Sequence, residues 1–190
     1  MRRASRMCAL SAAAALGLAS CDGGGDSGPG EAALGFDLYV SRAVMDHVGA
    51  FQFALLRDAD KYDCAQITST CLNDNENVGE DAIVPLKDAR GDPHPALVFS
   101  AELLGPNDGG SRTQDVMLRG VPVGGDYQLV IEALSRSNPP RLLGSTCHRV
   151  VEVRAGENPR ITPNPIKLVT PDGGVDEANP GIPCDPRFVK

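Results

Sequence analysis

The sequence contains no tryptophan and is poor in other rings, with three tyrosines, five phenylalanines and three histidines in 190 residues. Exposed aromatic side chains are the platforms on which sugars stack, so their scarcity argues against a glycan-binding surface. The histidines, His47, His94 and His148, lie far apart along the chain. None has the short spacing by which one element presents two metal ligands, so a histidine-based zinc site is not indicated.

The common catalytic motifs are also missing. There is no Gly-x-Ser-x-Gly, Ser-x-x-Lys or His-Glu-x-x-His pattern, and no glycine-rich segment is followed by the lysine or helix that a phosphate loop needs. Cys147 and His148 are adjacent, but neighbouring residues on a strand point to opposite faces and cannot form a catalytic pair. We therefore expect no enzymatic activity and no cofactor.

The apolar segment at residues 7–18 is too short to cross a bilayer, which takes about twenty residues. Arg2, Arg3 and Arg6 precede it, and this layout is typical of a secretory signal peptide, here residues 1–20. The motif Leu18-Ala19-Ser20-Cys21 resembles the lipobox of bacterial lipoproteins. The resemblance implies cleavage after Ser20 and a diacylglyceryl thioether on Cys21. The alternative is an ordinary signal peptide that is cut nearby.

Charge excludes one class of partner. Removal of residues 1–20 takes away three arginines and no acid, so the formal charge of −7 becomes −10. Such a surface repels phosphate backbones, so nucleic acid is not an expected partner. Membrane binding would depend on the acyl chains, because each buried CH₂ stabilises membrane binding by about 0.8 kcal/mol. We expect the bacterial cell envelope, on either membrane, because Asp22 matches an inner-membrane retention signal of enteric bacteria.

Composition divides the mature chain into three parts. Residues 21–31 are a Gly-rich linker that holds the domain some 15 to 20 Å from the lipid on average. Residues 32–169 are long enough for one domain with a single core. Residues 170–190 form a tail rich in proline and glycine, although Cys184 indicates that it is tethered to the domain.

Hydrophobic periodicity in the domain is two, as in half-buried strands. Seven or eight short strands of this kind predict an all-β fold, a single antiparallel β-sandwich. Pro85 places its run at a sheet edge, and Gly124-Gly125-Asp126 indicates a hairpin turn. The runs are residues 34–40, 51–57, 83–86, 96–104, 116–121, 127–134, 142–153 and 161–169.

Two segments resemble transthyretin-like, carboxypeptidase-regulatory-like β-sandwiches. Residues 121–129 (VPVGGDYQL) and 151–158 (VEVRAGEN) are similar to the "lP.G.Y.l.v" and "v.v.aGen" patterns of that family. The resemblance implies an immunoglobulin- or transthyretin-like fold and no chemistry, because such domains serve as spacers, adhesion modules or accessory domains.

Cysteine count predicts two disulfides. Cys8 leaves with the signal peptide and Cys21 would be acylated, which leaves four cysteines in an exported chain. These are Cys64, Cys71, Cys147 and Cys184. Three pairings are possible, and we expect the local one, Cys64 with Cys71 and Cys147 with Cys184. A Cys₄ metal site is disfavoured because no Cys-x₂-Cys pair occurs.

Acidic residues gather around the first expected disulfide, and calcium favours such oxygen ligands. The candidates are Asp58, Asp60, Asp63, Asp74 and Glu76. They do not follow the EF-hand order, because counting from Asp74 places Val78 at the fifth position and Pro85 at the twelfth. A solvated acidic loop is the simpler interpretation, and weak calcium binding is the alternative.

The sequence predicts a lipid-anchored envelope protein whose β-sandwich is a non-catalytic binding or structural module. One alternative is an envelope hydrolase or metal-dependent enzyme, which would need the three histidines or the acidic residues to converge. Another is a weak calcium-binding adhesion module. The protein partner and the oligomeric state remain open.

Overall fold

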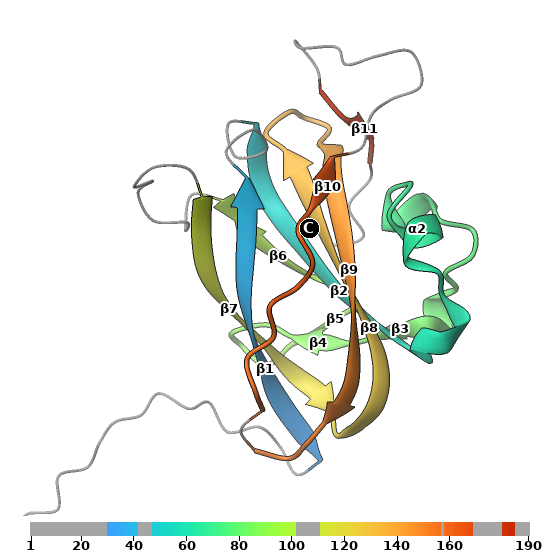
Figure 1. The fold of residues 1–190 in the computed structure, drawn as a ribbon, viewed down its shortest axis with the longest axis vertical. Coiled ribbons are helices and arrows are strands. Elements are labelled where there is room, and N and C mark those ends of the chain that lie inside the picture. Colours follow the sequence, from blue (N-terminus) through green and yellow to red (C-terminus); the bar gives the residue numbers. More distant parts are fainter. Residues whose placement is uncertain (1–29, 42–46, 102–110, 157, 169–179, 185–190) are drawn as a thin grey trace, which may run out of the picture.

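The structure is a computed structural model, and it describes residues 30–41, 47–101, 111–156, 158–168 and 180–184. They form two antiparallel sheets packed face to face, with very little helix (Figure 1). The predicted all-β sandwich class is therefore confirmed. The signal peptide, the lipobox, Cys21 and most of the linker lie outside the described residues.

The smaller sheet has the strand order β1-β7-β4-β5, and the larger has β10-β9-β8-β2-β3, with β6 also beside β2 and β11 beside β9. The strands are β1 (Glu31–Ser41), β2 (Val48–Arg57), β3 (Ile83–Val84), β4 (Leu86–Lys87), β5 (Pro93–His94), β6 (Leu97–Ser100), β7 (Ser111–Pro122), β8 (Gly124–Ser135), β9 (Arg141–Val153), β10 (Lys167–Leu168) and β11 (Ile182–Pro183). The helical turns are η1 (Ala59–Lys61), α2 (Cys64–Ile67), η2 (Leu72–Asp74) and η3 (Glu80–Ala82).

The main core lies between the two sheets. Alternate residues of the long strands point into it, as a period of two requires. Leu34 and Phe36 of β1 meet Phe53 of β2 and Leu129 and Ile131 of β8, all fully or almost fully buried. Burying a phenylalanine or leucine side chain stabilises a fold by about 1.5 to 3 kcal/mol, so these strands carry much of the stability.

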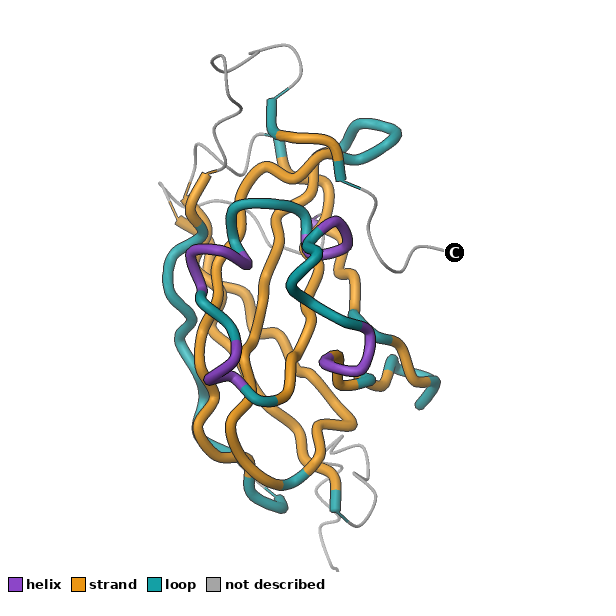
Figure 2. The backbone as a smooth tube through the Cα atoms, turned by 90° about the vertical axis from the view of Figure 1, so that its right-hand side faces the viewer, coloured by secondary structure: helices purple, strands orange, loops and turns teal. Residues whose placement is uncertain are grey.

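A third layer covers the outer face of the larger sheet. Residues 58–82, which we call the cap, contain the four helical turns and lie over the strands in Figure 2. Ile67 and Leu72 of the cap pack with Leu56 of β2 and Val130 of β8 in a second core. Strands β2 and β8 are consequently buried on both faces, which explains their continuous apolar runs. The patterns in the sequence did not predict this layer.

At Pro85 the chain passes from one sheet to the other. β3 pairs with β2 of the larger sheet, and β4, two residues later, pairs with β7 of the smaller one. The intervening proline is exposed and has no N–H to donate, so it ends one ladder without leaving a donor unpaired. The predicted sheet edge is correct for β3, which is the last strand in the order of the larger sheet, but not for β4, which lies between β7 and β5.

The predicted hairpin at Gly124-Gly125-Asp126 is wrong. β7 pairs in the smaller sheet and β8 in the larger, so this turn is a corner between the layers. Asp126 has a left-handed φ of 65°, and the Tyr127 hydroxyl donates to the Pro122 carbonyl at 3.1 Å across the corner. Val121 before the corner and Tyr127 after it both contribute to the main core between the two sheets.

A continuous strand over residues 161–169 is also wrong. Residues 158–168, which we call the strap, run from the smaller sheet to the larger one (Figure 1). Ile161 bridges Phe36 of β1, and Lys167 and Leu168 then pair with β9 as β10. Pro159, Pro163 and Pro165 lack the N–H that a ladder requires, so the strap cannot be a strand throughout.

All four predicted cysteines are in disulfides, but the expected local pairing is wrong. Cys64 is bonded to Cys147 and Cys71 to Cys184. The bonds join residues 83 and 113 positions apart and attach the cap to β9 and to the tail. The prediction of local pairing failed because the cap folds back over the sheet. This brings each cap cysteine next to a partner that is far away in the sequence. The tethering expected from Cys184 is confirmed.

Candidate functional site

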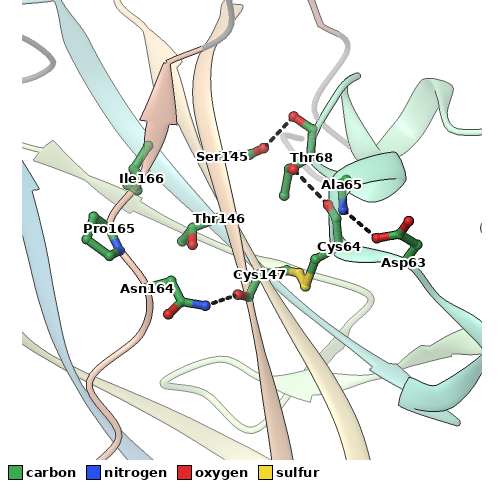
Figure 3. Close-up of a pocket in the computed structure, with 10 residues that line it drawn as sticks. All are labelled: Asp63, Cys64, Ala65, Thr68, Ser145, Thr146, Cys147, Asn164, Pro165 and Ile166. Atoms are coloured by element: carbon green, nitrogen blue, oxygen red, sulfur yellow. Dashed lines mark hydrogen bonds between the residues drawn. A yellow bond between two sulfur atoms is a disulfide. The ribbon is translucent and has the colours of Figure 1, made fainter.

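A cavity of about 620 Å³ lies between the cap, the outer edge of β9 and the strap (Figure 3). Its lining comes from three segments that are far apart in the sequence. The lining residues are Asp63, Cys64, Ala65, Thr68, Ser145, Thr146, Cys147, Asn164, Pro165 and Ile166. Pockets of 300 to 1,000 Å³ are typical of small-molecule sites, so this volume would accept a small ligand.

The cap wall is held by short-range hydrogen bonds. Asp63 precedes α2 and its Oδ1 accepts from the Ala65 N–H at 2.9 Å, which is a helix N-cap. The Thr68 hydroxyl donates to the Cys64 carbonyl at 2.7 Å and closes the same short helix. The Ser145 hydroxyl of β9 donates to the Thr68 carbonyl at 3.0 Å, so the cap wall is attached to the sheet beside the Cys64–Cys147 disulfide.

The strap forms the opposite wall of the cavity, beyond the point where the pairing between β10 and β9 ends. Lys167 is paired with Ser145, whereas two residues further along β9 the Cys147 carbonyl accepts from the side-chain Nδ2 of Asn164 at 3.1 Å. The Asn164 amide thus replaces a strand partner, since Pro163 and Pro165 on either side cannot donate backbone hydrogen bonds. Asn164 and Pro165 are exposed, so the cavity opens to solvent on this side.

The lining is mostly uncharged, with hydroxyl and amide groups beside Ala65, Pro165 and Ile166. Its one ionisable side chain outside the disulfide is Asp63, which already serves as a helix cap. Such a set can donate and accept hydrogen bonds but contains no nucleophile paired with a base. The arrangement is therefore suited to holding a small polar molecule.

The predicted calcium residues do not converge. Asp58 pairs with Lys61 at 2.7 Å, Asp60 with Arg149 at 2.9 Å, and Asp63 caps α2. Asp74 ends η2, and Glu76 lies beyond it in the cap. Within the described ranges, none of these residues belongs to a group of three ligand atoms close enough to hold a metal ion.

The three histidines lie on different elements. His47 is exposed ahead of β2, and His94 of β5 contacts the Asp88 carboxylate at 3.3 Å. The pKa of Asp88 is lowered mainly by a hydrogen bond from the backbone N–H of Asp92, and a second one from the backbone N–H of Arg90 lowers it further. His148 on β9 is half-buried, and this burial lowers its pKa. In the part of the chain that the structure describes, no histidine belongs to a group of three ligand atoms close enough together to hold a metal ion.

A second polar site, which was not predicted from the sequence, lies at the junction of β8, the cap and the tail. Glu132 of β8 is 1% exposed and accepts from the Leu72 N–H and from Gln52 Nε2, each at 2.6 Å. One of its oxygens lies within 4.8 Å of the sulfurs of Cys71 and Cys184. The available signal was a single acidic residue within the apolar run 129–134.

No family model matches this chain, and no curated protein or solved structure is significantly similar to it. In the described residues, no helix has both the length and the apolar character needed to span a membrane. Functional interpretation therefore depends on the residues themselves.

Proposed function

We propose that the protein is a bacterial lipoprotein of the cell envelope. In this proposal a transthyretin-like β-sandwich, tethered through Cys21, acts as a non-catalytic binding module. The cavity carries the proposal, because its lining offers hydrogen-bonding groups while its ionisable groups are already engaged in a helix cap and a disulfide.

Two disulfides in one domain support an exported location, since such bonds persist in oxidising compartments. The described part begins at Gly30, whose carbonyl accepts from the Val123 N–H at 2.9 Å at the β7–β8 corner. The tether would therefore join the domain at that corner. The cavity is lined by β9 residues 145–147, which pair with β8 residues 130–132, well inside the sheet and away from that corner. This spacing leaves the cavity accessible to a molecule in the aqueous phase.

Anchoring is tested with the full-length chain in a bacterial host. We expect mass spectrometry to find a mature amino terminus at Cys21 carrying a diacylglyceryl group, and the chain to fractionate with membranes. The Cys21→Ser variant should move to the soluble fraction. Cys8→Ser is the matched control and should leave the distribution unchanged. An unmodified Cys21, or membrane retention of Cys21→Ser, contradicts the proposal.

The same strains test the binding role. A photo-crosslinking residue at Ala65, on the cavity wall, should trap a discrete product in intact cells. The matched position is Met117, which is 43% exposed on β7 of the other sheet. Equal products from both positions, or none from Ala65, contradict a binding role for the cavity.

A further inference from the structure

The junction of the cap, the larger sheet and the tail brings two sulfurs and a carboxylate together. The Sγ atoms of Cys71 and Cys184 and one carboxylate oxygen of Glu132 all lie within 4.8 Å of one another. The three residues are at most 4% exposed. They come from three separate parts of the fold: the start of η2, the middle of β8 and the residue after β11.

The surroundings of Glu132 resemble the outer shell of a metal site. The Leu72 N–H and the Gln52 amide hold its two oxygens at 2.6 Å, and hydrogen bonds of this kind orient a ligating carboxylate. A second observation is that Gln52 Oε1 is buried and has no hydrogen-bond partner within the described residues. A buried acceptor without a donor is costly, and Gln52 is bound to Glu132 through its Nε2, so a donor bound beside Glu132 would lower that cost.

We propose that, once the Cys71–Cys184 disulfide is reduced, this cluster binds one thiophilic divalent cation such as Zn²⁺. The ligands are the two thiolates and the Glu132 carboxylate. Zinc binds thiolate and carboxylate ligands in tetrahedral sites, and a water molecule in the fourth position would supply the donor for Gln52 Oε1.

The chemistry balances with a dithiol or phosphine reductant. The reductant supplies two electrons, the S–S bond breaks and two protons are taken up, which gives two thiols. The cation then displaces both thiol protons and forms two metal–sulfur bonds, because only thiolates are ligands. The metal would thus replace the disulfide as the connection between cap, sheet and tail. This site does not depend on the lipid anchor or on the cavity.

Protection from alkylation tests the proposal on the unaltered full-length chain. The protein is reduced with a phosphine, freed of reductant under anaerobic conditions, mixed with one equivalent of Zn²⁺ and treated with iodoacetamide. Peptide mass spectrometry then follows each cysteine. We expect Zn²⁺ to slow alkylation of Cys71 and Cys184 at least tenfold and to leave the other four cysteines of the chain unaffected. Protection of any further cysteine, or of none, overturns the proposal, including when the reduced chain unfolds.

Variants identify the ligands, with Co²⁺ as a spectroscopic probe of thiolate coordination. Cys64→Ser/Cys147→Ser keeps the cluster and should bind one ion with two sulfurs, whereas Cys71→Ser/Cys184→Ser should bind none. The opposite result overturns the site. Glu132→Gln should weaken Zn²⁺ binding at least tenfold, and the exposed Glu152→Gln on β9 is its control. If Glu132→Gln does not fold, Co²⁺ binding by the two double cysteine variants decides whether the site exists.

Discussion

Glu132 shows what a single polar residue costs inside this domain. A carboxylate moved from water into a protein interior loses its hydration, and it is tolerated only where hydrogen bonds replace that hydration. Here the Leu72 N–H and the Gln52 amide do so, each at 2.6 Å. Since Leu72 belongs to the cap and Gln52 to β2, the carboxylate also fixes how the cap sits on the sheet.

His148 makes stability depend on pH. Burial of its ring lowers the pKa of His148 below the ordinary value of 6.5, so the unfolded chain binds this proton at a higher pH than the folded one. Below about pH 6.5 the unfolded state therefore holds more protons, and the free energy of unfolding falls as the pH falls. Well above that pH the ring is neutral in both states and contributes no pH dependence.

We predict that urea unfolding from about pH 7.5 down to about pH 5.5 shows a decreasing free energy of unfolding, and that His148→Gln reduces this decrease. His47→Gln, at an exposed position ahead of β2, is the matched control and should keep the wild-type profile. A pH profile of His148→Gln identical to that of the wild type would show that His148 is not the source.

Among the elements, β11 has little strand structure of its own and depends on contacts with β9. It pairs at two positions, Ile182 with Leu142 and Pro183 with Arg141. The Arg141 guanidinium donates to the carbonyls of Pro180 and Gly181 at 3.3 and 2.5 Å. Gly181 is buried at a φ of +90°, and a Cβ there would collide with the Leu142 carbonyl oxygen. The tail can dock here only because this residue is glycine.

Gly181→Ala should therefore destabilise the protein by about 2 to 4 kcal/mol, as a sum of left-handed backbone strain and overpacking. Gly91→Ala is the matched control, because Gly91 has a φ of +89° but nothing within 4 Å of the added Cβ. Gly91→Ala should lower the free energy of unfolding only by the backbone strain, about 1 to 2 kcal/mol. Urea unfolding of both variants gives the comparison, and equal losses would exclude the Leu142 collision.

At the scale of the whole molecule, the disulfides hold the cap, the larger sheet and the tail together. They close loops of 83 and 113 residues, for which the chain-entropy model gives about 4.5 to 5 kcal/mol each. The short loop from Cys64 to Cys71 would have contributed about 2 to 3 kcal/mol on the same model. The observed pairing therefore restricts the unfolded chain more strongly.

Peptide mapping under non-reducing conditions should recover the Cys64–Cys147 and Cys71–Cys184 peptides. Cys64→Ser/Cys147→Ser and Cys71→Ser/Cys184→Ser should each lower the free energy of unfolding by about 3 to 5 kcal/mol, measured in urea without reductant. A Cys64–Cys71 peptide from the native protein would contradict the pairing, and with it the placement of the cap.

Local patterns predicted the strands well because the cause of those patterns is local. Leu34 and Phe36, or Leu129 and Ile131, share one face of a strand whatever lies opposite, so alternation is visible in the sequence. Proline acts within its own residue, and the sheet edge predicted from Pro85 is therefore correct for β3, which ends just before it. The prediction failed in the strap because Pro163 and Pro165 interrupt the run 161–169, which was expected to be one strand.

The sequence by itself determined the β-class of the domain, most of its strands and the presence of two disulfides. Side-chain alternation, prolines and an even number of cysteines depend only on neighbouring residues or on composition. Only the tertiary structure decided which sheet each strand joins, how the cysteines pair, and that Glu132, Gln52 and two sulfurs meet. The cysteine pairing and the meeting of Glu132 with the two sulfurs depend on the cap folding back over the larger sheet. That fold brings together residues 60 to 113 positions apart, and no local pattern encodes such contacts.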